Sequence, residues 1–233
     1  MNIDYEKSLS EDFIRENKDK INWDYISIDQ KLSENFIREF QNKVCWINIS
    51  RYQEISEEFI HEFQDKVDWN YISYYQKLSE NFIRKFQDKI NWKYISYRQK
   101  LSEDFIFEFQ NKVSWNYISN SQILSEEFIE EFQNEVDWID ISIKQKLSIN
   151  FIREFQNKVD WFFISKYQKL SEKFIREFQN KINWNSLLEK YKYNLSFKGD
   201  KYRIKSDNYN SDYLEYNEFI DLALRLIALK AFQ

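Results

Sequence analysis

The residues that could do chemistry in this chain are few in kind. Among its 233 residues there is one histidine, one cysteine, one glycine and no proline. A zinc site needs several Cys or His ligands, and phosphate-binding or dinucleotide-binding loops need several glycines. We therefore expect no metal site, no cofactor and no nucleotide-binding loop. We also expect that the protein is not an enzyme, because no nucleophile, base and oxyanion donor can be named together.

Paired carboxylates recur along the chain, and most pairs directly follow a serine, as Glu57 and Glu58 do. Two carboxylates can act as acid and base in hydrolysis, but in the first turn of a helix they also complement the helix dipole. The second interpretation explains why the pairs recur. His61 and Cys45 each lack the partner that catalysis or metal binding would require, so we assign neither of them a function.

The net charge and the hydropathy of the chain argue against nucleic acid and membrane as partners. The chain has 34 Lys and Arg against 39 Asp and Glu, a formal charge of -5, which argues against binding nucleic acid mainly through its phosphates. Aromatic residues make up 19% of the chain, which is enough apolar surface for folding. The longest apolar run, 222–232, is too short to span a bilayer and contains Arg225 and Lys230. With no secretion signal apparent, we expect an intracellular protein without a membrane segment.

The elements that position these side chains follow from an internal repeat. The unit L-S-E-x-F-I-x-E-F-Q-x-K-V-x-W-x-Y-I-S-x-x-Q-K occurs eight times over residues 9–192. We divide the chain into a lead-in (1–8), the repeats (9–192) and a C-terminal segment (193–233). Tryptophans recur at intervals of 23 residues, and we expect them in the structural core: Trp23, Trp46, Trp69, Trp92, Trp115, Trp138, Trp161 and Trp184.

Each repeat contains two helix starts. Ser33 is a suitable N-cap for a first helix, helix A, which we expect to be roughly ten residues long. Along helix A, pairs such as Glu39 and Lys43 have the spacing of a helical ion pair. Asp68 or an equivalent residue caps the second helix, helix B, and only Cys45 lacks capping chemistry there. The Ser and Gln of helix B share its inner face, where we expect them to satisfy backbone groups of neighbouring repeats.

A unit of two short helices cannot bury its own core, so the repeats must stack. The sequence predicts an all-α fold, an α-solenoid of eight 23-residue two-helix repeats. Asn17, which replaces a phenylalanine in the first repeat, indicates a polar N-terminal cap. Residues 195–205 predict a small hairpin with a Gly-Asp turn at Gly199. Ser211 is expected to cap a last helix over 212–231, which either caps the repeats or docks a partner, including a second copy of the chain.

The variable positions of helix B are the candidate partner-binding residues. They lie one, two, five and six residues after each tryptophan and point away from the core. Tyrosine, arginine and isoleucine at such positions have the composition of a protein-binding face, although neutral drift would also make an exposed face variable. The candidates are Ile47, Arg51, Tyr52, Tyr74, Tyr75, Tyr97, Arg98, Ile139, Ile143, Phe162 and Tyr167.

The wording of the repeat, as in LSENFIREFQNKV (32–44) and DWNYISYYQK (68–77), resembles the 23-residue repeat proteins that giant DNA viruses of amoebae, the mimivirus-like group, encode in many copies. The resemblance covers residues 9–192. It implies a viral protein of the host cytoplasm or viral factory with an interaction role, and it supplies no catalytic residues. We therefore expect a non-enzymatic scaffold that binds a viral or host protein. The alternatives are an RNA-binding α-solenoid and an accessory subunit of a translation or transcription complex.

Overall fold

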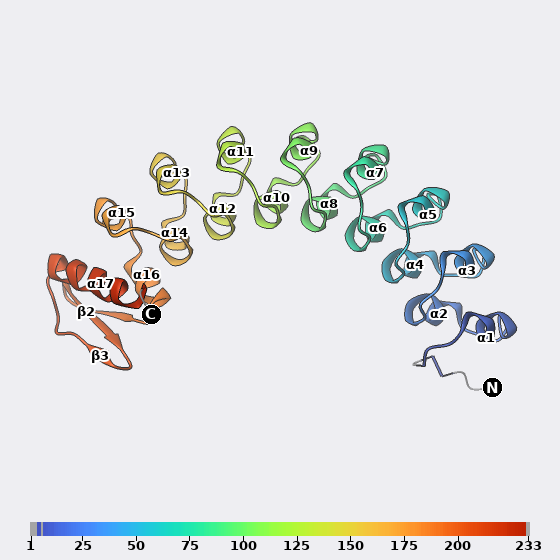
Figure 1. Cartoon of the computed structure of the whole chain (residues 1–233), viewed down its shortest axis with the longest axis horizontal. Helices are drawn as coiled ribbons and strands as arrows, with labels where there is room; N and C mark the ends of the chain where they lie inside the picture. The colour runs from blue at the N-terminus through green and yellow to red at the C-terminus, as the bar shows by residue number, and fades with distance from the viewer. Residues whose placement is uncertain (1–3, 6, 232–233) are drawn as a thin grey trace. The chain divides into compact units, whose positions relative to one another are not determined.

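The computed structural model describes residues 4–5 and 7–231, and residues 11–190 form a series of short paired helices joined by turns (Figure 1). The chain divides into two compact units, Met1–Gln122 and Ile123–Gln233. Within each unit the repeats pack in series, with odd-numbered helices in one row and even-numbered helices in a second row. This arrangement confirms the predicted α-solenoid, in which each repeat buries its core against its neighbours.

Each repeat contributes one helix to each row. Helix A of successive repeats is α1 (Glu11–Glu16), α3 (Glu34–Glu39), α5 (Glu57–Glu62), α7 (Glu80–Lys85), α9 (Glu103–Glu108), α11 (Glu126–Glu131), α13 (Ile149–Glu154) and α15 (Glu172–Glu177). Helix B is α2 (Trp23–Asp29), α4 (Trp46–Tyr52), α6 (Trp69–Tyr75), α8 (Trp92–Arg98), α10 (Trp115–Ser121), α12 (Trp138–Lys144), α14 (Trp161–Tyr167) and α16 (Trp184–Lys190).

Helix A begins as predicted but ends early. The Ser33 hydroxyl accepts a hydrogen bond from the Phe36 N–H (3.2 Å), and a serine caps every helix A in this way. The helix has six residues, so the predicted length of roughly ten is wrong. Phe40 leaves helical geometry at φ -107° and ψ 25°. The Gln41 carbonyl then accepts the indole N–H of Trp46 (2.9 Å) and does not continue the helix.

Helix B has two kinds of N-terminus. The Asp68 carboxylate accepts hydrogen bonds from the N–H groups of Asn70 and Tyr71, as predicted, and Cys45 makes no side-chain cap. Ser114 makes none either, so the expectation that Cys45 is the sole exception is wrong. The N-cap of helix B has ψ near 104° at Ser114, whereas the serine caps of helix A have ψ near 154°. In the helix B geometry the longer Asp and Asn side chains reach the backbone and the serine hydroxyl does not.

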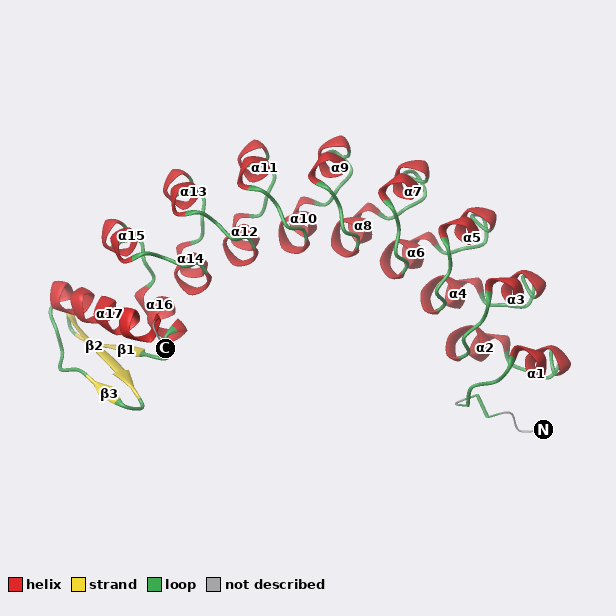
Figure 2. Ribbon diagram, in the orientation of Figure 1, coloured by secondary structure: helices red, strands yellow, loops and turns green. Residues whose placement is uncertain are grey.

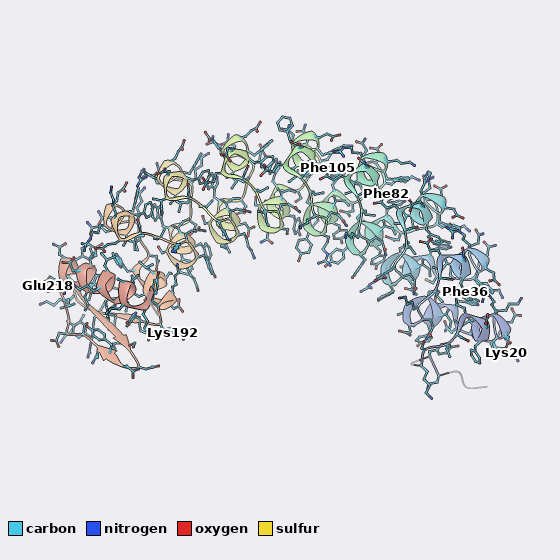
Figure 3. All side chains as sticks on the ribbon, viewed as in Figure 1. Lys20, Phe36, Phe82, Phe105, Lys192 and Glu218 are labelled. Atoms are coloured by element: carbon cyan, nitrogen blue, oxygen red, sulfur yellow. The ribbon has the colours of Figure 1, made fainter. Side chains whose placement is uncertain are left out.

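The tryptophans lie at the seam between repeats. The ring centroid of Trp23 is 5.0 Å from that of Phe40 and 6.3 Å from that of Phe36, and both phenylalanines belong to the next repeat. Seven tryptophans are half-buried, and Trp184 in the last repeat is buried. Most of the apolar side chains that are fully buried in the repeats are phenylalanine and isoleucine; Figure 3 labels Phe36 and Phe105, which are fully buried, and Phe82, which is 6% exposed. The indoles therefore close the edge of the core and join each repeat to the next.

Buried serines and glutamines bond neighbouring repeats through the backbone, as predicted. The Gln53 amide donates to the carbonyls of Ser27 (3.0 Å) and Gln30 (2.8 Å), and its oxygen accepts the Leu32 N–H (3.0 Å). The Ser27 hydroxyl donates to its own helix and accepts the N–H of Cys45 in the next repeat (3.0 Å). The same bonds recur between later repeats. These side chains therefore satisfy the backbone groups that close stacking would otherwise leave unpaired.

Ion pairs on the outer surface of helix A run between repeats. Glu39 pairs with Arg15 of the preceding repeat (2.8 Å), and Lys43 pairs with Asp19 of that repeat (2.7 Å). The prediction that Glu39 and Lys43 pair with each other is wrong, because the helix ends at Glu39 and Lys43 lies in the turn beyond it. Arginines of this series bond a glutamate 24 residues further along the chain, at Arg15, Arg38, Arg84 and Arg153.

The lead-in occupies the place of a preceding repeat. The Tyr5 hydroxyl accepts the N–H of Asn22 (2.7 Å), the bond that a serine hydroxyl accepts in later repeats. The Gln30 amide donates to the carbonyls of Tyr5 (3.0 Å) and Lys7 (3.2 Å). Asn17 is half-buried, and its side-chain amide donates to the carbonyl of Phe13 (2.9 Å). Polar contacts of the lead-in therefore hold the first repeat where contacts with a preceding repeat hold the later ones.

The C-terminal segment adds a small sheet (Figure 2). Strands β1 (Asn194–Lys198) and β2 (Lys201–Ser206) pair antiparallel, with Lys198 opposite Lys201. The predicted two-residue turn is thus confirmed, and Gly199 in it has φ +58°, a conformation that favours glycine. A third strand, β3 (Tyr209–Asn210), pairs with the end of β2 and was not predicted.

The last helix begins later than predicted. It is α17 (Tyr216–Ala231), and Ser211 does not cap it. The Ser211 hydroxyl instead accepts the N–H of Ile204 in β2 (3.0 Å) and donates to the carbonyl of Asp212 (2.7 Å). Because this bond holds Ser211 against the sheet, Ser211 cannot cap the helix, which begins only at Tyr216. There the Glu218 carboxylate accepts the N–H of Glu215 (3.2 Å).

Helix α17 packs against the last repeat. Leu187 and Leu188 of α16 form one buried cluster with Phe219, Ala223 and other residues of α17. This packing favours the capping interpretation of the helix, while Leu229 remains 65% exposed. Docking of a second copy on the Leu229 side stays a prediction. In the described part of the chain, no helix combines the length and apolar character that crossing a membrane requires.

Candidate binding surface

The variable positions of helix B form a continuous surface in the N-terminal unit because the helices that carry them are neighbours. Helices α4, α6, α8 and α10 pack successively against one another (Figure 1). The period of 23 residues places equivalent positions of each helix side by side. Inner-face residues such as Ile72 and Ser73 are fully buried, so the core is complete without the outer positions.

Tyrosines dominate this surface, and most of their rings contact one another. Tyr74 lies at the centre, 4.6 Å from Tyr75, 5.2 Å from Tyr94 and 6.3 Å from Tyr97, between ring centroids. Tyr97 in turn lies 5.3 Å from Tyr117. We define the tyrosine surface as these five tyrosines, two arginines, and two further tyrosines that contact Arg51. Its members are Arg51, Tyr52, Tyr71, Tyr74, Tyr75, Tyr94, Tyr97, Arg98 and Tyr117.

Both arginines lie over tyrosine rings. The Arg51 guanidinium carbon is 4.8 Å from the Tyr52 centroid and 5.4 Å from those of Tyr71 and Tyr75. The Arg98 guanidinium carbon is 4.7 Å from the Tyr74 centroid. Burial is the largest influence on the pKa of Arg51 and lowers it, but the surrounding tyrosine oxygens outweigh it and leave that pKa above its usual value. Both guanidinium groups are thus placed for cation–π contacts, which hold the tyrosine rings in position.

Two hollows flank the pair Tyr74 and Tyr75. One, of about 440 Å³, lies toward the helix N-termini and is lined by Asp68, Asn70, Tyr71, Tyr74, Tyr75 and Tyr94. The other lies toward the helix C-termini and has about 500 Å³. We call it the basic groove, and its lining is Tyr74, Tyr75, Gln76, Lys77, Leu78, Tyr97, Arg98, Gln99, Lys100, Ser121 and Gln122.

The structure brings together six of the candidate residues predicted from the sequence. These are Arg51, Tyr52, Tyr74, Tyr75, Tyr97 and Arg98. Ile47 is 53% exposed on α4. In the C-terminal unit, Ile139, Phe162 and Tyr167 are exposed and Ile143 is half-buried, on the neighbouring helices α12 and α14. Lys166 lies 5.8 Å from the ring centroids of Phe162 and Tyr167, which makes a second and smaller aromatic patch within that unit.

Sequence reasoning missed five members of the site. Tyr71, Tyr94 and Tyr117 stand two residues after a tryptophan, a position expected to point away from the core, but tyrosine recurs there and these residues were not chosen as candidates. Lys77 and Lys100 stand eight residues after a tryptophan and were treated in the same way. The sequence could have indicated these residues, because a residue outside the apolar pattern of a helix can face solvent even when it recurs in every repeat.

The surface offers hydrogen-bonding groups and apolar area. Tyrosine hydroxyls and arginine N–H groups can hydrogen-bond a ligand, and the rings supply apolar area. Across residues 4–5 and 7–231, no group of three or more His, Cys, Asp or Glu side chains is placed to hold a metal ion. His61 is exposed on α5, on the helix A side of the repeats, with its Nε2 3.2 Å from the Lys85 Nζ.

Comparison with known proteins gives no relative. No protein-family model, no curated protein and no solved structure matches this chain. The resemblance of the repeat to those of giant DNA viruses therefore stays a prediction, and arguments about function depend on the surface itself.

Proposed function

We propose that this protein is a non-enzymatic repeat scaffold that binds another protein through the tyrosine surface. One observation carries the proposal. Four successive repeats place seven tyrosines and two arginines in one surface, whose central rings contact one another, outside the buried core. Tyrosine and arginine are the residue types most enriched among those that dominate binding energy at protein interfaces.

The packing within the surface supports this function. Tyr75 and Tyr97 are 44% and 39% exposed, so each presents a rigid ring and a hydroxyl to solvent while part of the side chain is held. A side chain that is already ordered loses less conformational entropy when a partner binds. A solenoid also tolerates variation on such a face, because its stability comes from contacts between adjacent repeats.

The proposed cellular location is based on the sequence of the repeat alone. Its resemblance to repeats of giant DNA viruses suggests a viral protein that acts in the host cytoplasm or viral factory, where a viral or host protein would be the partner. An accessory role in a translation or transcription complex is compatible with the same surface and differs only in the identity of the partner.

Single-stranded RNA is the second candidate ligand. It is favoured by the basic groove, where Lys77, Arg98 and Lys100 lie beside exposed tyrosine. Bases stack on open aromatic faces, however, and here an arginine covers the ring of Tyr74 while Tyr94 meets it edge-on.

The test is recovery of the partner from the cells in which the protein is made, with and without nuclease, followed by mass spectrometry. We expect a stoichiometric protein that survives nuclease and is lost with the double variant Tyr75→Ala and Tyr97→Ala. Phe107→Ala removes an aromatic ring of similar exposure, 48%, from α9 on the helix A side and should leave recovery unchanged. Loss of the partner on nuclease treatment, or equal recovery by all variants, would contradict the proposal.

A further inference from the structure

We infer that the basic groove of the N-terminal unit binds an acidic, extended peptide segment of the partner. This inference rests on the proposed function and adds to it the chemistry of the bound segment. It depends on three features of the groove: its charge, its contrast with an equivalent groove in the same unit, and the way its rings are covered.

The charge of the groove is one-sided. Lys77, Arg98 and Lys100 line it, and no carboxylate does. Lys77 and Lys100 are exposed, and neither forms an ion pair or hydrogen bond with another residue of the described chain. The Arg98 guanidinium contacts the Tyr74 ring and makes a long hydrogen bond from Nε to the Tyr74 carbonyl (3.4 Å), so its charge is not neutralised. Three uncompensated cations at one groove favour a negatively charged ligand.

The equivalent groove, two repeats earlier, has the opposite charge. That groove has about 340 Å³ and is lined by Asp29, Lys31 and Glu54 among other residues. Glu54 occupies the repeat position of Lys100, and Lys31 that of Lys77. Because the backbone contacts of the two grooves are the same in kind, the fold does not require the cations. The two grooves share a lysine, Lys31 and Lys77, and differ in charge at three positions, where the earlier groove has Asp29, Tyr52 and Glu54 and the basic groove has Tyr75, Arg98 and Lys100. The net charge of the lining therefore changes sign between two grooves of the same backbone geometry.

The rings of the groove favour a peptide over a nucleic acid. The Tyr74 ring is covered by Arg98, and Tyr97 contacts Tyr74, Tyr117 and Arg98. Few ring faces remain for stacking of bases, whereas hydroxyls, ring edges and the three cations suit carboxylates. The volume of about 500 Å³ lies within the range of ligand pockets and accommodates a few side chains but no folded domain.

The experiment measures binding of defined probes to the full chain by fluorescence anisotropy at low and high salt. The probe is a fluorescein-labelled eight-residue peptide of alternating glutamate and leucine. Its neutral counterpart, alternating glutamine and leucine, and a ten-nucleotide oligouridine are the comparison ligands. We expect the acidic peptide to bind most tightly and to be weakened by salt, because its charges face exposed cations.

Variants test whether the groove is the site. Arg98→Gln should weaken the acidic peptide roughly threefold, and combined Lys77→Gln, Arg98→Gln and Lys100→Gln about tenfold, since exposed ion pairs have modest energies. Lys31→Gln removes one cation from the equivalent groove and should change nothing. These positions are exposed or lie outside the core, and unchanged thermal melting of each variant verifies that the fold is retained.

Four results would overturn the inference. If the glutamine peptide binds as tightly as the acidic one, or if neither peptide binds while Tyr75→Ala and Tyr97→Ala still abolish partner recovery, the acidic segment is wrong and the protein-binding function stands. If the chain self-associates and the triple variant dissociates it, the occupant is a second copy. If oligouridine binds most tightly and is weakened by the same substitutions, both the inference and the proposed function fail.

Discussion

The two outer surfaces of the repeats use charged residues differently. On the helix A surface, Arg38 reaches the next repeat, bonding Glu62 (2.7 Å) and lying 4.9 Å from the Phe59 ring centroid. On the helix B surface, Arg51 and Arg98 lie over tyrosines and pair with no carboxylate in the part of the chain that the structure describes. Charges on the first surface connect repeats, and so does the ion pair of Lys166 with Glu189 on the second (3.8 Å), whereas the two arginines of the tyrosine surface make no such pair among the described residues. The comparison separates residues kept for stability from residues available for recognition.

The seam beneath both surfaces sets the scale of stability. Gln53→Ala removes three hydrogen bonds between repeats and leaves two carbonyls and an N–H buried without partners. We expect the free energy of unfolding to fall by about 2–4 kcal/mol, measured by urea denaturation. Glu54→Ala, at the adjacent exposed position, is the control and should have no measurable effect. A small effect of Gln53→Ala would mean that water replaces the amide and that the seam is not the main source of stability.

Matched substitutions on the two surfaces should differ in their effect on the free energy of unfolding. Arg38→Ala loses an ion pair and an arginine–aromatic contact, so we expect a loss of about 1 kcal/mol. Tyr75→Ala should lose less, about 0.5 kcal/mol, because the ring contacts Tyr74 and Arg51 on the surface but fills no space in the core. Both variants are compared in one denaturation series. Equal losses would show that the tyrosine surface also stabilises the array, and the distinction drawn above would fail.

The helix A surface can also be improved where its pattern is broken. Glu130 stands one repeat before Arg153, at a position where most repeats have an arginine. The arginines of this series bond the glutamate 24 residues further along the chain, so Glu130 faces Glu154 instead of an arginine facing it. Glu130→Arg should raise the free energy of unfolding by about 0.5–1 kcal/mol, because one ion pair replaces two like charges. Glu130→Gln separates the two contributions, since it removes the repulsion alone. A destabilised arginine variant would show that repeats six and seven do not reproduce the geometry of their neighbours.

The smallest expected effect is a dependence on pH. Hydrogen bonds from the Arg153 guanidinium are the main reason that the pKa of Glu177 lies below its ordinary value of 4.5. A lowered pKa in the folded state contributes stability above pH 4.5 that is lost as the pH falls through the folded-state value. Glu177→Gln should therefore flatten the stability profile below pH 4.5, measured by thermal melting in steps of pH. Parallel profiles of variant and parent would mean that solvent screens the pair completely.

Much of the fold could be predicted because the repeat presents each signal eight times. Serine caps, the core phenylalanines and the Gly199 turn depend on short-range backbone preferences, which sequence reveals directly. The length of helix A could not be predicted, because the turn after Phe40 depends on an indole from the following helix. Ser211 misled for a related reason: a serine hydroxyl that suits a helix cap also suits a strand, and β2 lies closer.

The candidate site could be predicted only in part. Arg51, Tyr74 and Arg98 stood out because they differ between repeats, which marks positions that packing does not determine. Tyr71 and Tyr94 did not stand out, because recurrence in successive repeats resembles a structural requirement. The charge contrast between the two grooves depends on which loop residues of adjacent repeats share a hollow, and that requires the spacing of the helices in three dimensions.

Gln53 and its counterparts bridge neighbouring repeats by hydrogen bonds, and these glutamine bridges limit how the gene can change in length. Gln53 contacts residues 26, 23 and 21 positions earlier in the chain, and its counterparts repeat those spacings. Loss or gain of a single codon within a repeat would shift every bridge that spans it, whereas duplication or deletion of a whole 23-residue unit would preserve all of them. A gene of this kind is therefore expected to change length in steps of 69 nucleotides, with the outer tyrosines and lysines free to diverge between copies.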